Sequence, residues 1–145
     1  MAPPIGNMSV TVSQLTAQAL GTHVLLDLWG VDPELLDDGA ALEACLVAAA
    51  QRGGAQVVEA RIHRFEPQGV TGVVILAESH LALHTWPELG FAAVDVFTCG
   101  LPAVAEAIAR EVVVALAPER HELRRLERGA AAAPHPLRAA AGGGH

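Results

Sequence analysis

The stretch AESHLALHTWPELGFAAVDVFTCG, residues 77–100, holds most of the reactive side chains of a 145-residue chain. It contains a Glu-Ser pair, two histidines, a tryptophan and one of the two cysteines. Its runs HLALHTW and FAAVDVF have the length and composition of β-strands, and turn residues separate them. Because side chains alternate along a strand, His80 and His84 are expected on one face. This stretch predicts two strands of a sheet with polar groups on one side.

Elements on both sides of this stretch complete a predicted sheet with helices. Further strands are expected at residues 21–29, 55–65, 71–77 and 120–129, the last at an edge. One helix is expected to begin at Asp32-Pro33 and end before Gly53-Gly54, and a second to begin at Leu101-Pro102. This order predicts an α+β fold, a two-layer sandwich of a mainly antiparallel sheet with helices packed on one face. A sheet covered on one side only suggests a partner subunit.

The composition favours one folded domain. Hydrophobic residues make up 52% of the chain and charged residues 17%, the balance of a compact protein rather than a disordered one. We expect this domain at residues 21–129, with a flexible extension at 1–20 and a low-complexity tail at 130–145. No apolar run approaches the ~18–20 residues of a membrane span, and no secretory signal is recognisable. A cytoplasmic location is therefore expected.

Charge and residue types exclude several classes of function. The net charge of −7 argues against nucleic-acid binding, which needs clustered basic residues. Cys45 and Cys99 could form one disulfide, but free thiols are expected in a reducing compartment. All nine basic residues are arginine. A pyridoxal-phosphate enzyme and a Walker P-loop both require lysine, so both are excluded.

The residues of the dense stretch allow more than one chemistry. Ser79 with His84 as a base would make a nucleophile. The pattern GxSxG is absent and no obvious aspartate orients His84, so a hydrolase triad has little support. His80 and His84 could share a metal ion, but further ligands are not identifiable and we expect no metal. A surface serine without a catalytic role is the alternative.

The string ESHLALHTWPELGFAAVDVFTCG, with the upstream HRFEPQGVTGVVILA, resembles the bacterial S-adenosylmethionine decarboxylase proenzyme family. The resemblance runs from about Gly21 to Gly129 and is most specific between His63 and Gly100. Members of this family carry no pyridoxal phosphate and make a covalent pyruvoyl cofactor from their own backbone. The resemblance therefore explains a decarboxylase without lysine.

The same resemblance implies a self-cleavage between Glu78 and Ser79. The Ser79 hydroxyl attacks the carbonyl carbon of Glu78, and β-elimination then breaks the chain and leaves Ser79 as the pyruvoyl group. His84 is implied as the base of this processing, and Thr71 as a hydroxyl that supports the oxyanionic intermediate. Family members usually carry serine at the position of Thr71. Ser79 and His84 are five positions apart, so the chain must bend at Ser79 for the two to meet.

Roles in the second reaction follow from the resemblance as well. The pyruvoyl group forms a Schiff base with the substrate amine, and Cys99 returns a proton to the substrate carbon after CO₂ leaves. Phe65 and Trp86 are implied against the adenine and the sulfonium, and Glu88 against the ribose. The implied assembly is a homodimer of processed α/β pairs.

The function expected from the resemblance is the conversion of S-adenosylmethionine to its decarboxylated form, the aminopropyl donor for spermidine biosynthesis. Two alternatives stay open. The same pyruvoyl machinery could act on arginine or ornithine, or the chain could be an unprocessed, non-catalytic relative that binds a ligand or a partner subunit.

Overall fold

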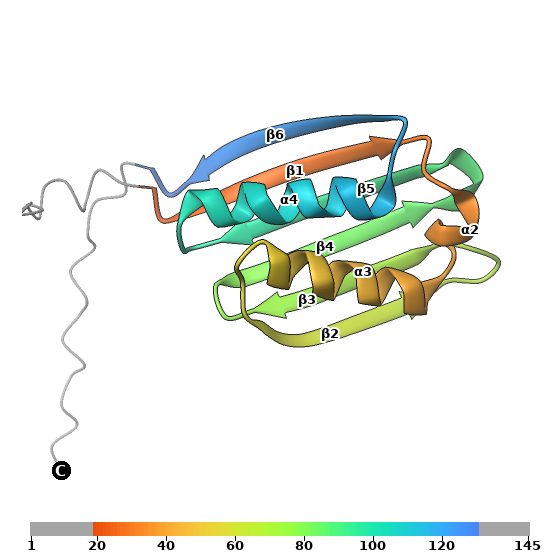
Figure 1. Ribbon diagram of the computed structural model, residues 1–145, viewed down its shortest axis with the longest axis horizontal. Coiled ribbons are helices and arrows are strands. Elements are labelled where there is room, and N and C mark those ends of the chain that lie inside the picture. The colour runs from red at the N-terminus through yellow and green to blue at the C-terminus, as the bar shows by residue number, and fades with distance from the viewer. Residues whose placement is uncertain (1–18, 131–145) are drawn as a thin grey trace, which may run out of the picture.

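The computed structural model describes residues 19–130 as one six-stranded antiparallel sheet with its helices on one face (Figure 1). The strand order is β2-β3-β4-β5-β1-β6, and every neighbouring pair is antiparallel. This architecture confirms the predicted α+β sandwich. The predicted extension at 1–20 and tail at 130–145 lie outside the described residues, apart from residues 19, 20 and 130.

The element bounds agree closely with the predicted strands. The strands are β1 (Gly21–Trp29), β2 (Val57–Arg64), β3 (Val70–Leu76), β4 (Ser79–Trp86), β5 (Phe91–Thr98) and β6 (Arg120–Arg128). The helices are α2 (Pro33–Leu36), α3 (Gly39–Arg52), the 3₁₀ helix η1 (Pro87–Leu89) and α4 (Pro102–Leu116). β2 and β6 form the two edges, and β4 and β5, from the dense stretch, lie side by side in the middle.

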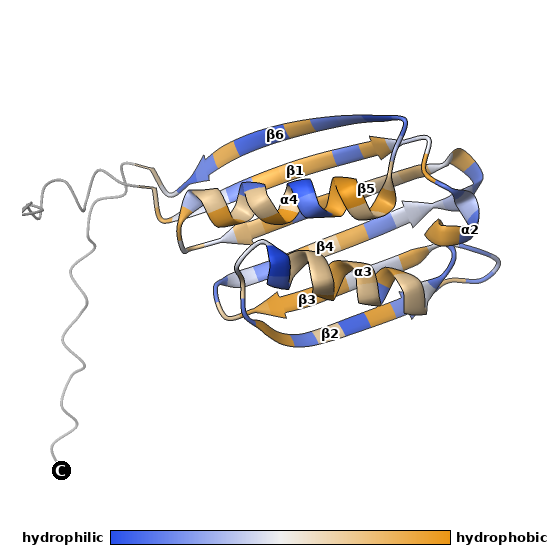
Figure 2. Ribbon diagram, viewed as in Figure 1, coloured by the Kyte–Doolittle hydropathy of each residue, from blue (hydrophilic) through white to orange (hydrophobic). Residues whose placement is uncertain are grey.

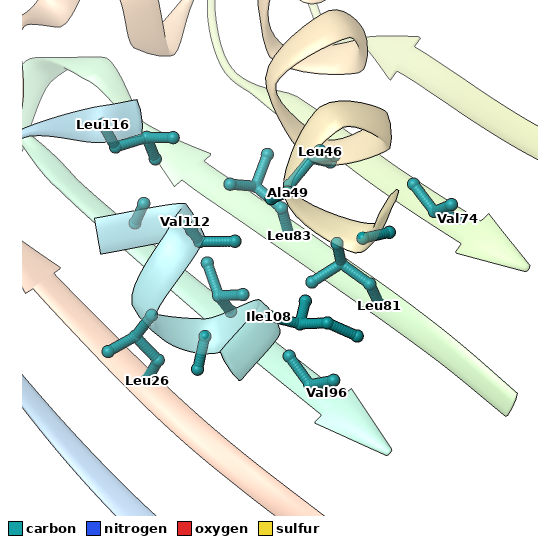
Figure 3. Packing of buried hydrophobic residues seen from close by; sticks show 14 of the residues in the cluster. Leu26, Leu46, Ala49, Val74, Leu81, Leu83, Val96, Ile108, Val112 and Leu116 are labelled. Atoms are coloured by element: carbon teal, nitrogen blue, oxygen red, sulfur yellow. The ribbon is translucent and has the colours of Figure 1, made fainter. Parts of the chain in front are cut away.

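The core lies between the sheet and the two long helices. Along the central strands β1 and β5 alternate side chains face the helices. Figure 2 shows hydrophobic and hydrophilic positions mixed along the edge strand β2, whereas the edge strand β6 is mostly hydrophilic. In Figure 3, Leu46 of α3 and Ile108 of α4 point toward Leu81 and Leu83 of β4, and all four are fully buried. Each such side chain contributes about 1.5–3 kcal/mol of hydrophobic free energy. The packed middle of the sheet therefore gives β4 and β5 a rigid base.

Two glycines let α3 approach its neighbours closely. A Cβ on Gly72 of β3 would lie 2.7 Å from Ile62 Cδ1 and 3.3 Å from Leu46 Cδ1. A Cβ on Gly53, which follows α3, would lie 2.8 Å from the backbone nitrogen of Ile108. A larger residue at Gly72 would push α3 away from the sheet, and one at Gly53 would push the end of α3 away from α4.

The first predicted helix is wrong in its extent, because the chain forms two helices where one was expected. Asp32 does cap α2, accepting a bond from Glu34 N–H at 3.0 Å, but α2 ends at Leu36. Asp38 then caps α3 by accepting from Ala41 N–H at 3.0 Å. An aspartate that caps a new helix stops the preceding one, because its side chain competes for backbone N–H groups.

No helix among residues 19–130 covers the other face of the sheet, here called the outer face (Figure 1). Side chains of intermediate burial line it, and apolar ones lie exposed there, with Ile75 at 42% and Trp86 at 39% exposure. Within the same range no helix is both long and apolar enough to cross a membrane. Both predicted histidines of β4 belong to this outer face.

Candidate active site

Ser79 lies at a tight turn, where the two residues Ala77 and Glu78 connect β3 to β4. Leu76 and Ser79 pair across this turn. Ser79 has a φ of +153°, and Ala117 is the only other non-glycine residue with positive φ among residues 19–130. Such a φ is sterically costly for a residue with a Cβ and persists only where surrounding contacts impose it. The chain turns at Ser79, but this turn does not bring Ser79 to His84 as expected, because β4 pairs regularly from Ser79 onward.

The carbonyl oxygen of Glu78, the residue before Ser79, accepts two hydrogen bonds from Cys99. The backbone N–H of Cys99 donates at 2.9 Å and its thiol at 3.1 Å. Cys99 reaches this position because it follows β5, whose last residue, Thr98, pairs directly with Ser79. Two donors on one carbonyl oxygen polarise the carbonyl and stabilise negative charge that develops on it. The structure therefore brings Glu78, Ser79 and Cys99 together.

Thr98 adds an unusual feature at the same place. Its side chain is fully buried on the helix side of the sheet, and its Oγ1 has no hydrogen-bond partner within the described part of the chain. A buried hydroxyl without a partner costs about 1–3 kcal/mol. The strained backbone of Ser79 and the unpaired hydroxyl of Thr98 therefore belong to the same cross-strand pair.

The other predicted site residues form a second group at the opposite end of β4. Thr71 and His84 are cross-strand partners, and Thr71 Oγ1 lies 3.0 Å from His84 Nδ1. A cavity of about 280 Å³ adjoins them. Its lining includes five of the predicted residues: Phe65, Thr71, His84, Trp86 and Glu88. The cavity is at the lower limit of pockets that hold small ligands, about 300 Å³.

The two groups do not meet within one chain. Ser79 begins β4, and His84 is five residues further along the same strand. At about 3.3 Å per residue, their backbones are about 16 Å apart. The bend at Ser79 does not shorten this separation, because the strand continues in regular register with β3 and β5 from Ser79 onward. The chain therefore carries two half-sites, the Ser79 half and the His84 half.

A larger cavity of about 550 Å³ adjoins the Ser79 half. Cys99 and the following Gly100 and Leu101 line one side of it, and Arg125 and Glu127 of β6 line the other. Space for a ligand of moderate size is thus present next to the Cys99 thiol.

The turn that carries Phe65 is fixed by an ion pair. Arg64 Nη2 lies 2.8 Å from Asp37 Oδ2, and Asp37 Oδ1 accepts from Gly69 N–H at 3.0 Å. The Arg64 hydrogen bond, followed by that of Gly69, holds the pKa of Asp37 below its ordinary value, and Asp37 in turn raises the pKa of Arg64. Asp37 thus ties the β2–β3 turn to α2.

A cluster of side chains on the outer face was not predicted from the sequence. His23 Nε2 and His80 Nε2 lie 3.1 Å and 2.9 Å from the same oxygen, Asp95 Oδ2. Arg128 Nη1 lies 3.0 Å from His23 Nδ1. These residues come from four strands and are far apart in sequence, so no local motif could have revealed them. His80 contacts Asp95, whereas His84 contacts Thr71.

Comparisons with known proteins agree in fold and in family. The family model described as S-adenosylmethionine decarboxylase matches residues 22–129. The chain is 47% identical over 110 residues to the S-adenosylmethionine decarboxylase proenzyme of Methanococcus maripaludis strain S2, covering 76% of this chain and 90% of that protein. The proenzyme of Parasynechococcus marenigrum is 49% identical over 117 residues, covering 79% and 89% of the two chains. A crystal structure of the adenosylmethionine decarboxylase from Aquifex aeolicus VF5 matches with a TM-score of 0.73 and 39% identity, covering 77% of this chain and 92% of that one.

Proposed function

Because this chain belongs to the S-adenosylmethionine decarboxylase family, we propose that it cleaves itself between Glu78 and Ser79 and that Ser79 becomes its pyruvoyl cofactor. Its activity is the decarboxylation of S-adenosylmethionine, and the product is the aminopropyl donor for spermidine synthesis. The relatives that match are proenzymes, which agrees with activation by processing. No finding favours arginine, ornithine or a non-catalytic role.

This proposal rests on the hydrogen bonding and the backbone conformation of the Glu78–Ser79 peptide. Its carbonyl oxygen holds two donors from Cys99, and Ser79 has a strained φ. Attack of Ser79 Oγ on the Glu78 carbonyl carbon places negative charge on that oxygen, where the N–H and the thiol stabilise it. Cleavage of the bent peptide also releases strain. These features suit a bond that has to break.

The proposed cleavage proceeds through an ester and an enamine. The Ser79 hydroxyl replaces the Ser79 nitrogen on the Glu78 carbonyl carbon, the C–N bond breaks, and the nitrogen takes up a proton to give an ester. A base then removes the Ser79 α-proton, and the Glu78 carboxylate leaves as a carbon–carbon double bond forms. Water hydrolyses the resulting enamine and ammonia leaves. The product is a pyruvoyl group at the start of the second fragment.

When present, the pyruvoyl group supplies an electron-withdrawing ketone that makes loss of CO₂ from the substrate possible. The chain's own residues hold the substrate and move protons. Cys99 already lies at the scissile bond, which supports its role as proton donor at that point. The exposed rings of Phe65 and Trp86 suit an adenine face and a sulfonium cation, and Glu88 beside them suits a ribose hydroxyl.

We also infer that the complete site needs two copies of the chain. The base His84 and the nucleophile Ser79 are about 16 Å apart in one chain, too far for proton transfer. The His84 half borders the outer face, on which Ile75 and Trp86 are exposed, and Ser79 lies at the end of the same strand. In a two-fold dimer every contact occurs twice, so Ser79 of each copy can meet His84 of the partner subunit. With Nδ1–H donated to Thr71, the Nε2 lone pair of His84 is free to take a proton.

Mass spectrometry of the purified chain after prolonged incubation tests the cleavage. We expect two fragments, residues 1–78 and 79–145, and a single uncut chain for Ser79→Ala. Release of labelled CO₂ from S-adenosylmethionine, compared with arginine and ornithine, tests the substrate. An uncut wild-type chain with a free serine would refute the proposal, and CO₂ release from arginine or ornithine alone would refute the substrate.

A further inference from the structure

The cluster around Asp95 is built on the outer face of the three central strands of this region. In the sheet, His23 of β1 and His80 of β4 are both register partners of Phe97 of β5, one on each side. Asp95 is two residues before Phe97 and so projects from the same face. Its Oδ2 accepts from His23 Nε2 at 3.1 Å and from His80 Nε2 at 2.9 Å. Asp95 Oδ2 on β5 therefore links side chains of β1 and β4, the strands on either side of β5.

A chain of hydrogen bonds sets the orientation of the first histidine. The Arg128 guanidinium has only donors, so the 3.0 Å contact from Nη1 to His23 Nδ1 is a donation to that nitrogen. His23 then carries its proton on Nε2 and donates it to Asp95. The order Arg128, His23, Asp95, His80 therefore forms one chain of hydrogen bonds that contains a positive guanidinium and a negative carboxylate.

Two histidines and an aspartate are also a common donor set for a divalent metal. The second ring nitrogen of a metal-bound histidine usually donates to a carboxylate or a carbonyl. Here a guanidinium occupies that place beside His23, which opposes a cation at the cluster. The geometry favours a hydrogen-bonded clamp.

The clamp acts on the residue that directly follows the scissile bond. His80 is covalently attached to Ser79, and its ring stacks on Phe97 with an interplanar angle of 22° and centroids 6.0 Å apart. Phe97 also meets the His23 ring edge-on at 5.3 Å. The Glu78 side of the bond is held by Cys99 and the Ser79 side by the His80 clamp. Ser79 thus sits with its unusual φ between two fixed points.

After cleavage, the contacts of Cys99 with Glu78 no longer hold residue 79 in place. Once the bond to Glu78 is broken, residue 79 is a chain end tethered only through His80. Chain ends lose their order unless something holds them, whereas catalysis needs the reacting group in one place. The ladder bonds of β4 fix the backbone, and the Asp95–His80 contact fixes the side chain next to the new terminus.

We propose that Asp95 is a positioning residue that acts through His80, holding residue 79 in place for self-cleavage and again as the terminus that bears the pyruvoyl group. This inference rests on the proposed function. It assigns a role to a carboxylate that touches neither the scissile bond nor either cavity lining.

The test compares first-order cleavage rates of freshly made precursor by mass spectrometry. Asp95→Asn keeps one acceptor but replaces the other oxygen by a donor, and we expect cleavage at least about 10-fold slower, since small misplacements of reacting groups have effects of that order. The matched control is Asp27→Asn, the same change on the outer face of β1. We expect its rate to be unchanged.

A second pair of variants separates positioning from folding. His80→Gln keeps an N–H that can reach Asp95 and is expected to retain most of the rate, whereas His80→Leu is expected to lose it. In matured Asp95→Asn we expect a lower kcat with KM near the wild-type value. Melting temperatures are compared in the uncleavable Ser79→Ala background, where Asp95→Asn is expected within a few degrees of its parent.

The results of these measurements separate a positioning role of Asp95 from a structural role, from a metal-dependent role and from a failure of the proposed function. Equal cleavage rates for wild type and Asp95→Asn would overturn the positioning role while leaving the proposed function intact. A slow rate that merely accompanies unfolding in the Ser79→Ala background, or cleavage that stops on addition of EDTA, would overturn it in favour of a structural or a metal-dependent role. An uncut wild-type chain would instead refute the proposed function, and the inference with it.

Discussion

Mixing two inactive variants gives the sharpest test of a site shared between two copies of the chain. Ser79→Ala removes the proposed nucleophile and leaves His84, and His84→Ala removes the proposed base and leaves Ser79. The two backbones are about 16 Å apart on β4, a separation that proton transfer within one chain cannot bridge. Each variant alone should therefore stay uncut. Only a mixed dimer can combine the intact nucleophile of one chain with the intact base of the other.

The yield of cleaved chain follows from the two-fold arrangement. If both variants are co-expressed equally and pair at random, about half of the dimers are mixed, and each mixed dimer contains one complete site. About a quarter of all chains should then be cut. All of them should be His84→Ala chains, because only these retain Ser79. A mass tag on one variant makes the two kinds of fragment distinguishable by mass spectrometry.

Three results would contradict this prediction. If cleavage used Ser79 and His84 of the same chain, the mixture would stay uncut, like each variant alone. If His84→Ala alone were cut at the wild-type rate, His84 would not be the base. A cut Ser79→Ala chain would instead identify another residue as the nucleophile.

Three further changes probe the site and its support. Cys99→Ala should still be cut, since its backbone N–H continues to bind the Glu78 carbonyl. Its kcat for CO₂ release should fall by about 10²-fold or more with loss of the proposed proton donor, and wild-type turnover would contradict that role. Asp37→Asn should lower the melting temperature at neutral pH but not in acid, because Arg64 holds the pKa of Asp37 below its ordinary value. The ionised Asp37 stabilises the fold fully at a pH above its ordinary pKa, and this stabilisation is lost as the pH falls through its lowered pKa. An equal loss of melting temperature at both pH values would contradict this. Thr98→Val should leave the free energy of unfolding unchanged or raise it by about 1 kcal/mol in a denaturant titration, because it removes an unpaired buried hydroxyl of similar shape; a loss of 2 kcal/mol or more would reveal a partner for that hydroxyl.

Much of the fold was predictable because local physics sets it. Strand-like runs and the turn residues between them place all six strands within two residues of their observed bounds. The extent of the first helix was harder to predict, because several aspartates follow one another near its start. Asp32 and Asp38 both act as caps, and only the docking of Asp37 onto Arg64 and Gly69 shows where the chain interrupts the helix.

Residue identities also led to the family and to the candidate residues. The segment from Phe65 to Cys99 contains all eight of them, and this density made the resemblance specific. What a linear segment does not reveal is which of its residues share a place in space.

The sequence alone determined the kind of sheet and the bond proposed to break, since strand periodicity and reactive side chains are written in consecutive residues. Only the tertiary structure decided that the candidates form two half-sites, because an extended strand separates five residues by about 16 Å whatever their chemistry. It alone revealed the clamp of His23, Asp95 and Arg128 on His80, since pairing of distant strands brings these residues together.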